Sequence, residues 1–435
     1  MKRRLMTAVA CAGLLSSAAT LADSTTPFPR LAANWLSNQN YQDPNIQKQL
    51  ARGNIALINV WPGWDAGRGT TVDQVVKNIK AINPNTKVFL YILNEAVSKT
   101  LSQATDPAWL ELNSKVNSMK WFLYASGGCC SIVDSFWSGN VTVNNTLYAP
   151  TDSNGDRWVD WYAKWAVRNY ATPNPSVDGF MTDNFFVKPR VDGDWNRDGK
   201  VDSKSDPTVA TWQRQGLRRH VDDLHKLMPG KMQMGNISDW GDPDAVLTEY
   251  QGQLNGGLIE GALGNSWSIE SWNSWSAMMT AYRKIMAALA EPRLAVFQQT
   301  GSATDYQGMR YGLGSTLLDN GYYAYNTSTS YGDAPFFDEY NVKLGLAVTG
   351  PQTQAWQSGV YRRDFENGIV LVNPKGNGQK TITLETDYKR ISGSQAPSVN
   401  NGQSVRSVTL QDRDGLILLR LTPKSKPKAP VLAAQ

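Results

Sequence analysis

The chain has 435 residues, and 43 Lys and Arg against 38 Asp and Glu give it a formal net charge of +5. So balanced a composition argues against a nucleic-acid partner, because binding phosphates requires a concentrated basic face. The only two histidines, His220 and His225, lie in one expected helix without metal-ligand spacing, so acid–base chemistry must come from carboxyl groups.

The first 22 residues have the pattern of a secretory signal. Lys2, Arg3 and Arg4 precede an apolar run that ends at Leu15, and small residues follow up to Ala22. This apolar run is too short to span a bilayer, and no later segment is apolar enough to do so. We therefore expect a signal peptide over residues 1–22 and a secreted or periplasmic protein with no membrane span.

From residue 27 to about residue 326, short β-branched or aromatic runs alternate with amphipathic stretches. This alternation predicts an α/β fold, a (β/α)8 TIM barrel over residues 27–350. The nine candidate strands are residues 31–35, 55–61, 87–93, 121–124, 179–182, 232–235, 257–259, 294–297 and 322–325. The expected helices are residues 71–82, 156–170, 207–228, 243–250, 272–290 and 306–319. A (β/α)8 barrel has only eight strands, so one of the nine candidates is not a barrel strand. Residues 121–124 fit better as part of an excursion before the strand that ends at Asp183.

Two strand ends carry acids. The run 177–186 ends its apolar stretch on Asp183, and the run 256–263 ends its apolar stretch on Glu260. The C-terminal ends of barrel strands meet at one mouth, so both acids are predicted to face one substrate. Such a pair is what glycosidic cleavage requires. The structural alternative is that either acid only caps the next helix.

Other strand ends are polar or carry an indole ring, as a hydroxyl-rich ligand would require. The predicted substrate-binding residues are Trp35, Trp61, Asn94, Asn236, Trp267, Gln298 and Asn326. Trp61 and Trp267 are the expected stacking platforms, and Glu95 and Asp239 are rival acids. The alternative is that Asn and Asp stand at strand ends as turn residues.

The segment from Asp194 to Asp202 has the DxNxDGxxD spacing of a calcium loop. The predicted ligands are side chains of Asp194, Asn196, Asp198 and Asp202 and the backbone carbonyl of Lys200. Ser205 stands where such a loop has its bidentate acid. The sequence predicts a structural Ca²⁺, with a solvated acidic turn as the alternative.

After Gly350 the pattern changes to short strands separated by Asn-Gly and Gly-rich turns. We expect a small C-terminal antiparallel β-sandwich domain over residues 351–422. The Lys-, Pro- and Ala-rich residues 423–435 are expected to form a disordered tail.

Four segments carry a family resemblance: TDNFF at 182–186, LIEG at 258–261, PFFDEY at 335–340 and GVYRRDFENGIVLVNP at 359–374. They resemble a group of largely uncharacterised bacterial glycoside hydrolases that is similar to the α-galactosidase-like (β/α)8 superfamily. In those barrels an Asp after the fourth strand is the nucleophile and an acid after the sixth is the proton donor. The resemblance therefore implies Asp183 as nucleophile and Glu260 as acid/base, where similar α-glycosidases often have Asp.

These features together predict a secreted glycoside hydrolase. We expect it to cleave α-linkages of a polysaccharide or oligosaccharide by a two-carboxylate, retaining mechanism. The alternative from another class is a non-catalytic carbohydrate-binding protein on the same scaffold. The expected partners are a carbohydrate substrate and no nucleic acid, and the expected state is a monomer.

Overall fold

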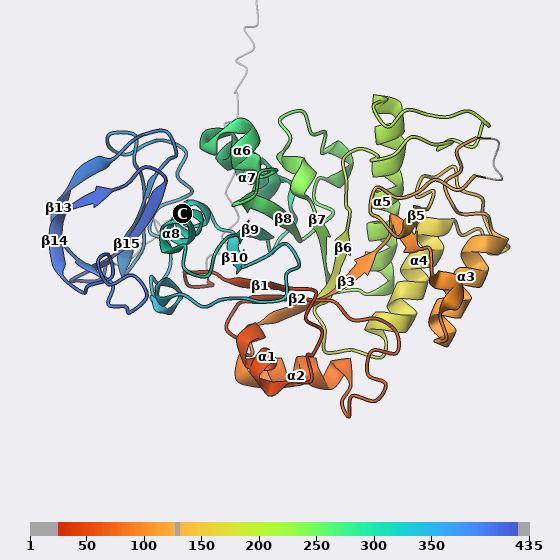
Figure 1. The fold of residues 1–435 in the computed structure, drawn as a ribbon, viewed down its shortest axis with the longest axis horizontal. Helices are drawn as coiled ribbons and strands as arrows, with labels where there is room; N and C mark the ends of the chain where they lie inside the picture. Colours follow the sequence, from red (N-terminus) through yellow and green to blue (C-terminus); the bar gives the residue numbers. More distant parts are fainter. Residues whose placement is uncertain (1–24, 127–130, 425–435) are drawn as a thin grey trace, which may run out of the picture.

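The computed structural model describes residues 25–126 and 131–424 (Figure 1), so the predicted signal peptide lies outside the described residues. Eight parallel strands form one sheet in the order β1-β2-β3-β6-β7-β8-β9-β10. A parallel bridge between Leu31 and Tyr323 joins the two edges and closes the sheet into a barrel. The strands are β1 Ala32–Trp35, β2 Ile55–Ile58, β3 Lys87–Leu93, β6 Gly179–Asp183, β7 Met232–Asn236, β8 Gly256–Leu263, β9 Leu294–Thr300 and β10 Tyr322–Asn326.

The barrel strands are buried on both faces, which explains why they are continuous apolar runs in the sequence. Side chains such as Leu57, Phe89 and Val296 fill the barrel interior. Alternate residues such as Ile58 and Leu90 pack outward against the helices. The predicted (β/α)8 fold is confirmed.

Helices surround the strands, with α1 and α2 on one side of the barrel, α6 and α7 on another, and α3 to α5 on a third (Figure 1). They are α1 Pro44–Leu50, α2 Val72–Ile82, α3 Pro107–Ser118, α4 Trp158–Ala166, α5 Pro207–Leu227, α6 Ile269–Asn273, α7 Trp275–Ala288 and α8 Tyr306–Leu317. Short helical turns are η2 Leu101–Gln103, η3 Val167–Ala171, η4 Ser238–Gly241, η5 Thr248–Tyr250 and η6 Asp338–Asn341. None of the helices within 25–126 and 131–424 is both long and apolar enough to cross a membrane.

The predicted helix 243–250 is wrong. Only the short turns η4 and η5 follow β7, although Asp242 accepts a hydrogen bond from the backbone N–H of Asp244 as the N-cap residues of α1, α3 and α5 do. Trp240 and Tyr250 then stack, with ring centroids 5.1 Å apart, and hold the segment against the barrel.

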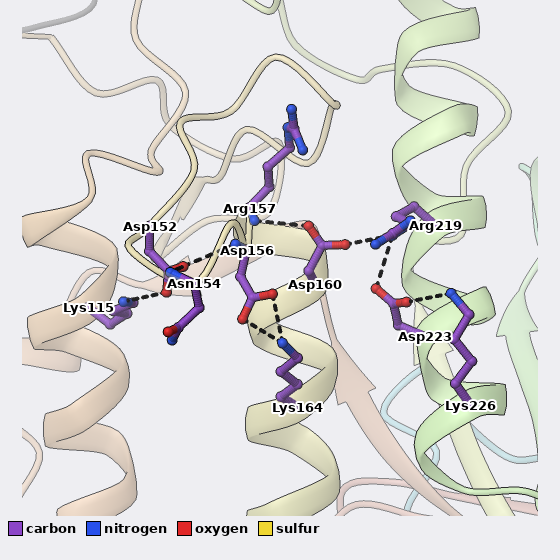
Figure 2. A network of polar contacts seen from close by, with 10 residues as sticks. All are labelled: Lys115, Asp152, Asn154, Asp156, Arg157, Asp160, Lys164, Arg219, Asp223 and Lys226. Atoms are coloured by element: carbon purple, nitrogen blue, oxygen red, sulfur yellow. Dashed lines mark hydrogen bonds and ion pairs between the residues drawn. The ribbon is translucent and has the colours of Figure 1, made fainter.

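The segment between β3 and β6 is a long insertion that carries β4 Ala96–Ser98, β5 Asn140–Thr142, α3 and α4. Residues 121–124 lie in it and form only isolated bridges, so they are the excursion that the strand count required. Polar contacts connect α3, α4 and α5 at this side of the barrel (Figure 2). Lys115 of α3 pairs with Asp152 at 2.8 Å, and Asp160 of α4 pairs with Arg219 of α5 at 2.7 Å.

The C-terminal region is an antiparallel sheet of five strands in the order β11-β12-β15-β13-β14, and it curves around its own apolar core (Figure 1). The strands are β11 Tyr361–Asp364, β12 Gly368–Asn373, β13 Lys380–Arg390, β14 Ser404–Leu410 and β15 Asp414–Arg420. The predicted antiparallel β region after the barrel is thus present, but its five described strands form a single curved sheet where a sandwich of two sheets was expected. The expected tail residues from 425 onward lie outside the described residues.

Helix α8 lies between the barrel and this sheet. Every residue from Gly308 to Leu317 is buried, because β9 and β10 cover one side of the helix and β12 and β15 the other. Val370, Val372 and Ile417 belong to the same apolar cluster as the outer face of the barrel. Arg310 of α8 pairs with Asp414 at 3.1 Å across this contact.

Candidate active site

Asp183 and Glu260 both line a cavity of about 530 Å³ at the C-terminal ends of the barrel strands. Asp183 is the last residue of β6, and Glu260 lies in β8, with β7 between these two strands. The structure therefore brings the two predicted acids to one cavity.

Asn236, the last residue of β7, bridges the two acids. Its Nδ2 donates a hydrogen bond of 3.0 Å to Asp183 Oδ1 and another of 2.7 Å to Glu260 Oε2. These two oxygens cannot be farther apart than the sum of both lengths. A limit of this size for one pair of oxygens fits the ~5–5.5 Å that separates the carboxyl groups of retaining pairs.

Two tyrosines complete this row of side chains. Tyr91 of β3 donates a hydrogen bond of 2.6 Å to Asp183 Oδ2, and Tyr331, in the loop after β10, donates one to Glu260 Oε1. Burial raises the pKa of each tyrosine, and the adjacent carboxylate raises it further. Both hydroxyls therefore remain protonated donors at neutral pH.

Sequence reasoning missed both tyrosines. Tyr91 could have been found, because it lies two residues after the inward-facing Phe89 and so shares its face of β3. Tyr331 gave no such signal. Its φ of +54° is rare for a bulky residue, and its backbone carbonyl accepts the N–H of Leu36, which follows the neighbouring strand β1. Its position depends on a loop conformation.

The surroundings of Glu260 raise its pKa. Burial raises the pKa of Glu260, and the charge of Asp183 adds to this, while hydrogen bonds from Tyr331 and Asn236 partly offset it. A carboxyl group with a raised pKa keeps its proton at higher pH and can serve as a general acid. A carboxyl group with a raised pKa beside a second carboxyl group is typical of an acid and nucleophile pair.

A bulge in β8 positions Glu260. The register with β9 shifts between Ile259 and Leu263, and Gly261 has a φ of +58°, in the left-handed region. The Gln298 side chain accepts the N–H of Gly261 at 2.7 Å. A Cβ on Gly261 would lie 2.1 Å from the Trp267 ring, so only glycine fits there.

The other predicted binding residues divide into two groups. Asn236 lines the cavity of the two acids, whereas Trp61 and Trp267 line separate adjoining cavities. Four predicted residues are instead enclosed and hydrogen-bonded within the protein, namely Trp35, Asn94, Gln298 and Asn326. Gln298 supports the β8 bulge and donates to Asn326.

The rival acids are both buried. Glu95, 2% exposed, accepts hydrogen bonds from Asn184 and Ser135, and burial raises its pKa to about 7. It lines none of the cavities described here. Asp239 lines the cavity that holds Trp267, and burial raises its pKa to about 6.

The segment expected to bind calcium turns sharply at Gly199. Gly199 has a φ of +89°, and its N–H donates to Asp194 Oδ2 at 3.0 Å. Asp194 is fully buried, yet its Oδ1 has no hydrogen-bond partner among the described residues. Asp202 lies close to the other acids of the loop. Burial raises its pKa, and the charges of Asp198 and Asp194 raise it further. No three acidic, His or Cys side chains of the described residues, however, already meet as a metal centre.

A family model described as hypothetical glycosyl hydrolase family 15 matches residues 80–369. Among solved structures, the chain is similar to the glycoside hydrolase domain of PelA from Pseudomonas aeruginosa, with a TM-score of 0.42 and 13% identity over 70% of this chain and 96% of that one. It is also similar to the GH36 α-galactosidase AgaA of Geobacillus stearothermophilus, with a TM-score of 0.45 and 11% identity over 92% and 56%. An α-amylase from Geobacillus thermoleovorans complexed with acarbose gives a TM-score of 0.49 and 9% identity over 94% and 98%. No curated protein matches the sequence.

Proposed function

Since the chain belongs to hypothetical glycosyl hydrolase family 15 and is a glycoside hydrolase, we propose that Asp183 and Glu260 perform the cleavage. The observation that carries this proposal is the pair of carboxyl groups bridged by Asn236, of which Glu260 has the raised pKa. No His is available for another acid–base system in this cavity, whose lining contains none.

In the proposed reaction, Asp183 attacks the anomeric carbon while protonated Glu260 gives its proton to the departing glycosidic oxygen. A covalent glycosyl–Asp183 ester forms, and the leaving sugar departs as an alcohol. Glu260, now ionised, takes a proton from water, whose oxygen attacks the anomeric carbon and releases Asp183. Retention follows from the two displacements, and the short distance between the carboxyl oxygens supports it.

The bridging and donor side chains have matching roles. Tyr91 and Asn236 each give Asp183 a hydrogen bond, which orients the attacking carboxylate. As Glu260 loses its proton, Tyr331 and Asn236 donate to the carboxylate that forms. These donors are in place before reaction, so little reorganisation accompanies the transfer of charge.

A panel of α- and β-linked glycans tests the proposal through the release of reducing ends. We expect release from α-linked members, and a loss of roughly 10³-fold or more for Asp183→Asn and Glu260→Gln. NMR of the first product anomer tests retention. Binding of glycans without any release would contradict hydrolysis and favour the carbohydrate-binding alternative.

We also propose that the loop from Asp194 to Asp202 binds a structural Ca²⁺. The buried, unpartnered Asp194 Oδ1 and the turn at Gly199 support this, and the loop must close further around the ion to complete its ligands. The ion would take oxygen from Asp194, Asn196, Asp198 and Asp202 and from the Lys200 carbonyl.

Export is the last proposed property. It rests on the charged, apolar and small-residue order of residues 1–22. N-terminal sequencing of the protein collected outside the cytoplasm, with a start after Ala22 as the expected result, tests it.

A further inference from the structure

The cavity with the two acids adjoins two others. On one side lies a cavity of about 560 Å³, which we call the α3 lobe. Trp109 and Leu112 of α3 line it, and it shares Tyr91 with the central cavity. On the other side lies a cavity of about 590 Å³, which we call the α6 lobe. Ile269 and Trp272 of α6 line it, and it shares Glu260 with the central cavity. The three cavities therefore adjoin one another with the acids in the middle one, and α3 and α6 lie on different sides of the barrel (Figure 1).

The α6 lobe presents flat aromatic rings to solvent. Phe136, Trp137, Trp267 and Trp272 are among the exposed large apolar side chains, and all four line this lobe. Trp272 is 64% exposed. Exposed apolar rings that gather in a concave site are unfavourable unless something covers them, and the faces of sugar rings stack on such surfaces.

A polar pair in the same lobe has free hydrogen-bonding capacity. Arg190 and Asp239 form an ion pair at 3.4 Å, but Arg190 Nε and Asp239 Oδ1 are buried without a partner among the described residues. The Asp239 side chain is only 9% exposed. Both side chains line the lobe and Arg190 is 32% exposed, so a bound group that both accepts and donates is favoured beside this pair. A sugar hydroxyl has that property.

The α3 lobe is a second binding region of different character. Trp61, Trp109 and Tyr162 supply aromatic surface to it, and the exposed residues Thr100 and Gln103 lie at its solvent side. The polar contacts among α3, α4 and α5 hold two of its walls in place (Figure 2). Each lobe alone has the volume of a whole small-molecule site, which is about 300–1,000 Å³.

We propose that the enzyme is endo-acting: the three cavities act as one binding cleft for a run of several sugar residues across both lobes, and the acids cleave an internal linkage. An enzyme that removes terminal sugars needs a site that ends at the reacting sugar, whereas here a further cavity adjoins the acids' cavity on each side. This inference rests on the proposed function and adds the mode of attack and the length of substrate.

The mode of attack is tested with the polysaccharide from the glycan panel that gives most reducing ends. We expect the mean polymer mass, followed by light scattering, to fall steeply while only a small share of linkages is cut. A mass that falls in proportion to released ends, with one small sugar as product, would show attack at chain ends. That result would overturn endo action and leave the glycosidase intact. Absence of reducing ends from every polymer would overturn the proposed function and this inference with it.

The α6 lobe is tested separately by Trp272→Ala. We expect kcat/KM to fall roughly three- to tenfold more for long than for short oligosaccharides of the same sugar, since only a long chain reaches this ring. Trp356→Ala is the matched control, because Trp356 is 40% exposed and lies outside the three cavities. Equal losses at all lengths, in a variant with unchanged melting temperature, would remove Trp272 from the binding cleft and overturn the α6 lobe as a binding region.

Discussion

At the scale of single residues, the Tyr331 hydroxyl opposes the effect of burial on Glu260. Its hydrogen bond favours the ionised carboxylate and so lowers a pKa that burial raises. The pH at which activity falls on the alkaline side should be set by the pKa of Glu260, because Glu260 must be protonated to act as the acid. Activity is thus present below the pKa of Glu260 and is lost as pH rises through it.

Tyr331→Phe should therefore move the alkaline limb of kcat/KM upward, by up to about one pH unit. Removing the donor leaves the ionised form less stable, so the proton stays on to higher pH. Tyr340→Phe is the control, since the Tyr340 hydroxyl is buried without a partner among the described residues. A downward shift in the Tyr331 variant would contradict the assignment of the limb to Glu260.

The strand-end rule identified Asp183, Asn236 and Glu260 but did not separate them from enclosed neighbours. Asn94 and Gln298 also follow apolar runs, yet each turns into the protein and hydrogen-bonds there. Sequence alternation cannot make this distinction, because the β8 bulge adds residues out of step with β9. The direction of a strand-end side chain is fixed only once the local register is known.

At the scale of elements, the β8 bulge connects the acid to the aromatic surface of the α6 lobe. Gly261→Ala places a methyl group within the volume of the Trp267 ring and must displace the ring or the bulge. We expect kcat to fall at least about tenfold, since an acid displaced by ~1 Å loses its alignment. Steady-state kinetics on the best panel glycan measures this.

Gly378→Ala supplies the comparison for that variant. Gly378 also has a positive φ, +66°, but no atom lies within 4 Å of the added Cβ. Both variants should carry a backbone cost of about 1–2 kcal/mol, and only Gly261→Ala should lose activity. A similar loss in both would show that general destabilisation is responsible.

The proposed calcium site can be tested as an element on its own. Chelation should lower the melting temperature and added Ca²⁺ should restore it; at a hundred times Kd the ion contributes about 2.7 kcal/mol. Asp194→Asn should remove most of this dependence, whereas exposed Asp387→Asn should retain it. A melting temperature unaffected by chelator or Ca²⁺ would leave the loop a solvated turn.

The elements most accurately predicted are the barrel strands, because parallel strands covered on both faces are distinctive apolar runs. The helix expected at 243–250 failed for a physical reason. Its spacing suits a helix, but the Trp240–Tyr250 stack stabilises another path. Contacts of that kind depend on tertiary neighbours and leave no local pattern.

At the scale of the whole molecule, we expect the C-terminal sheet to stabilise the barrel. Buried Arg363 of β11 donates hydrogen bonds to the carbonyls of Leu317 and Asp319 at the end of α8. Gly415 of β15 approaches the backbone of Arg310 so closely that a Cβ would lie 2.1 Å from its carbonyl oxygen. The two regions share one apolar cluster.

Truncation after Gly350 should therefore yield insoluble or unfolded protein. It would uncover the apolar face of α8 and leave Arg310 without Asp414. Solubility and circular dichroism, compared with the full chain, measure the result. A soluble truncated enzyme with full activity would contradict a stabilising role, and one that loses only polysaccharide binding would make the sheet a binding module.

The burial of α8 between two sheets also fixes an order of events while the chain is being made. All eight barrel strands leave the ribosome by Asn326, but β12 and β15, which cover α8, follow only at residues 368–420. For the time it takes to translate that interval, a complete set of barrel strands carries an uncovered apolar helix. Nascent chains at this stage are the ones for which a chaperone has the most exposed surface to bind.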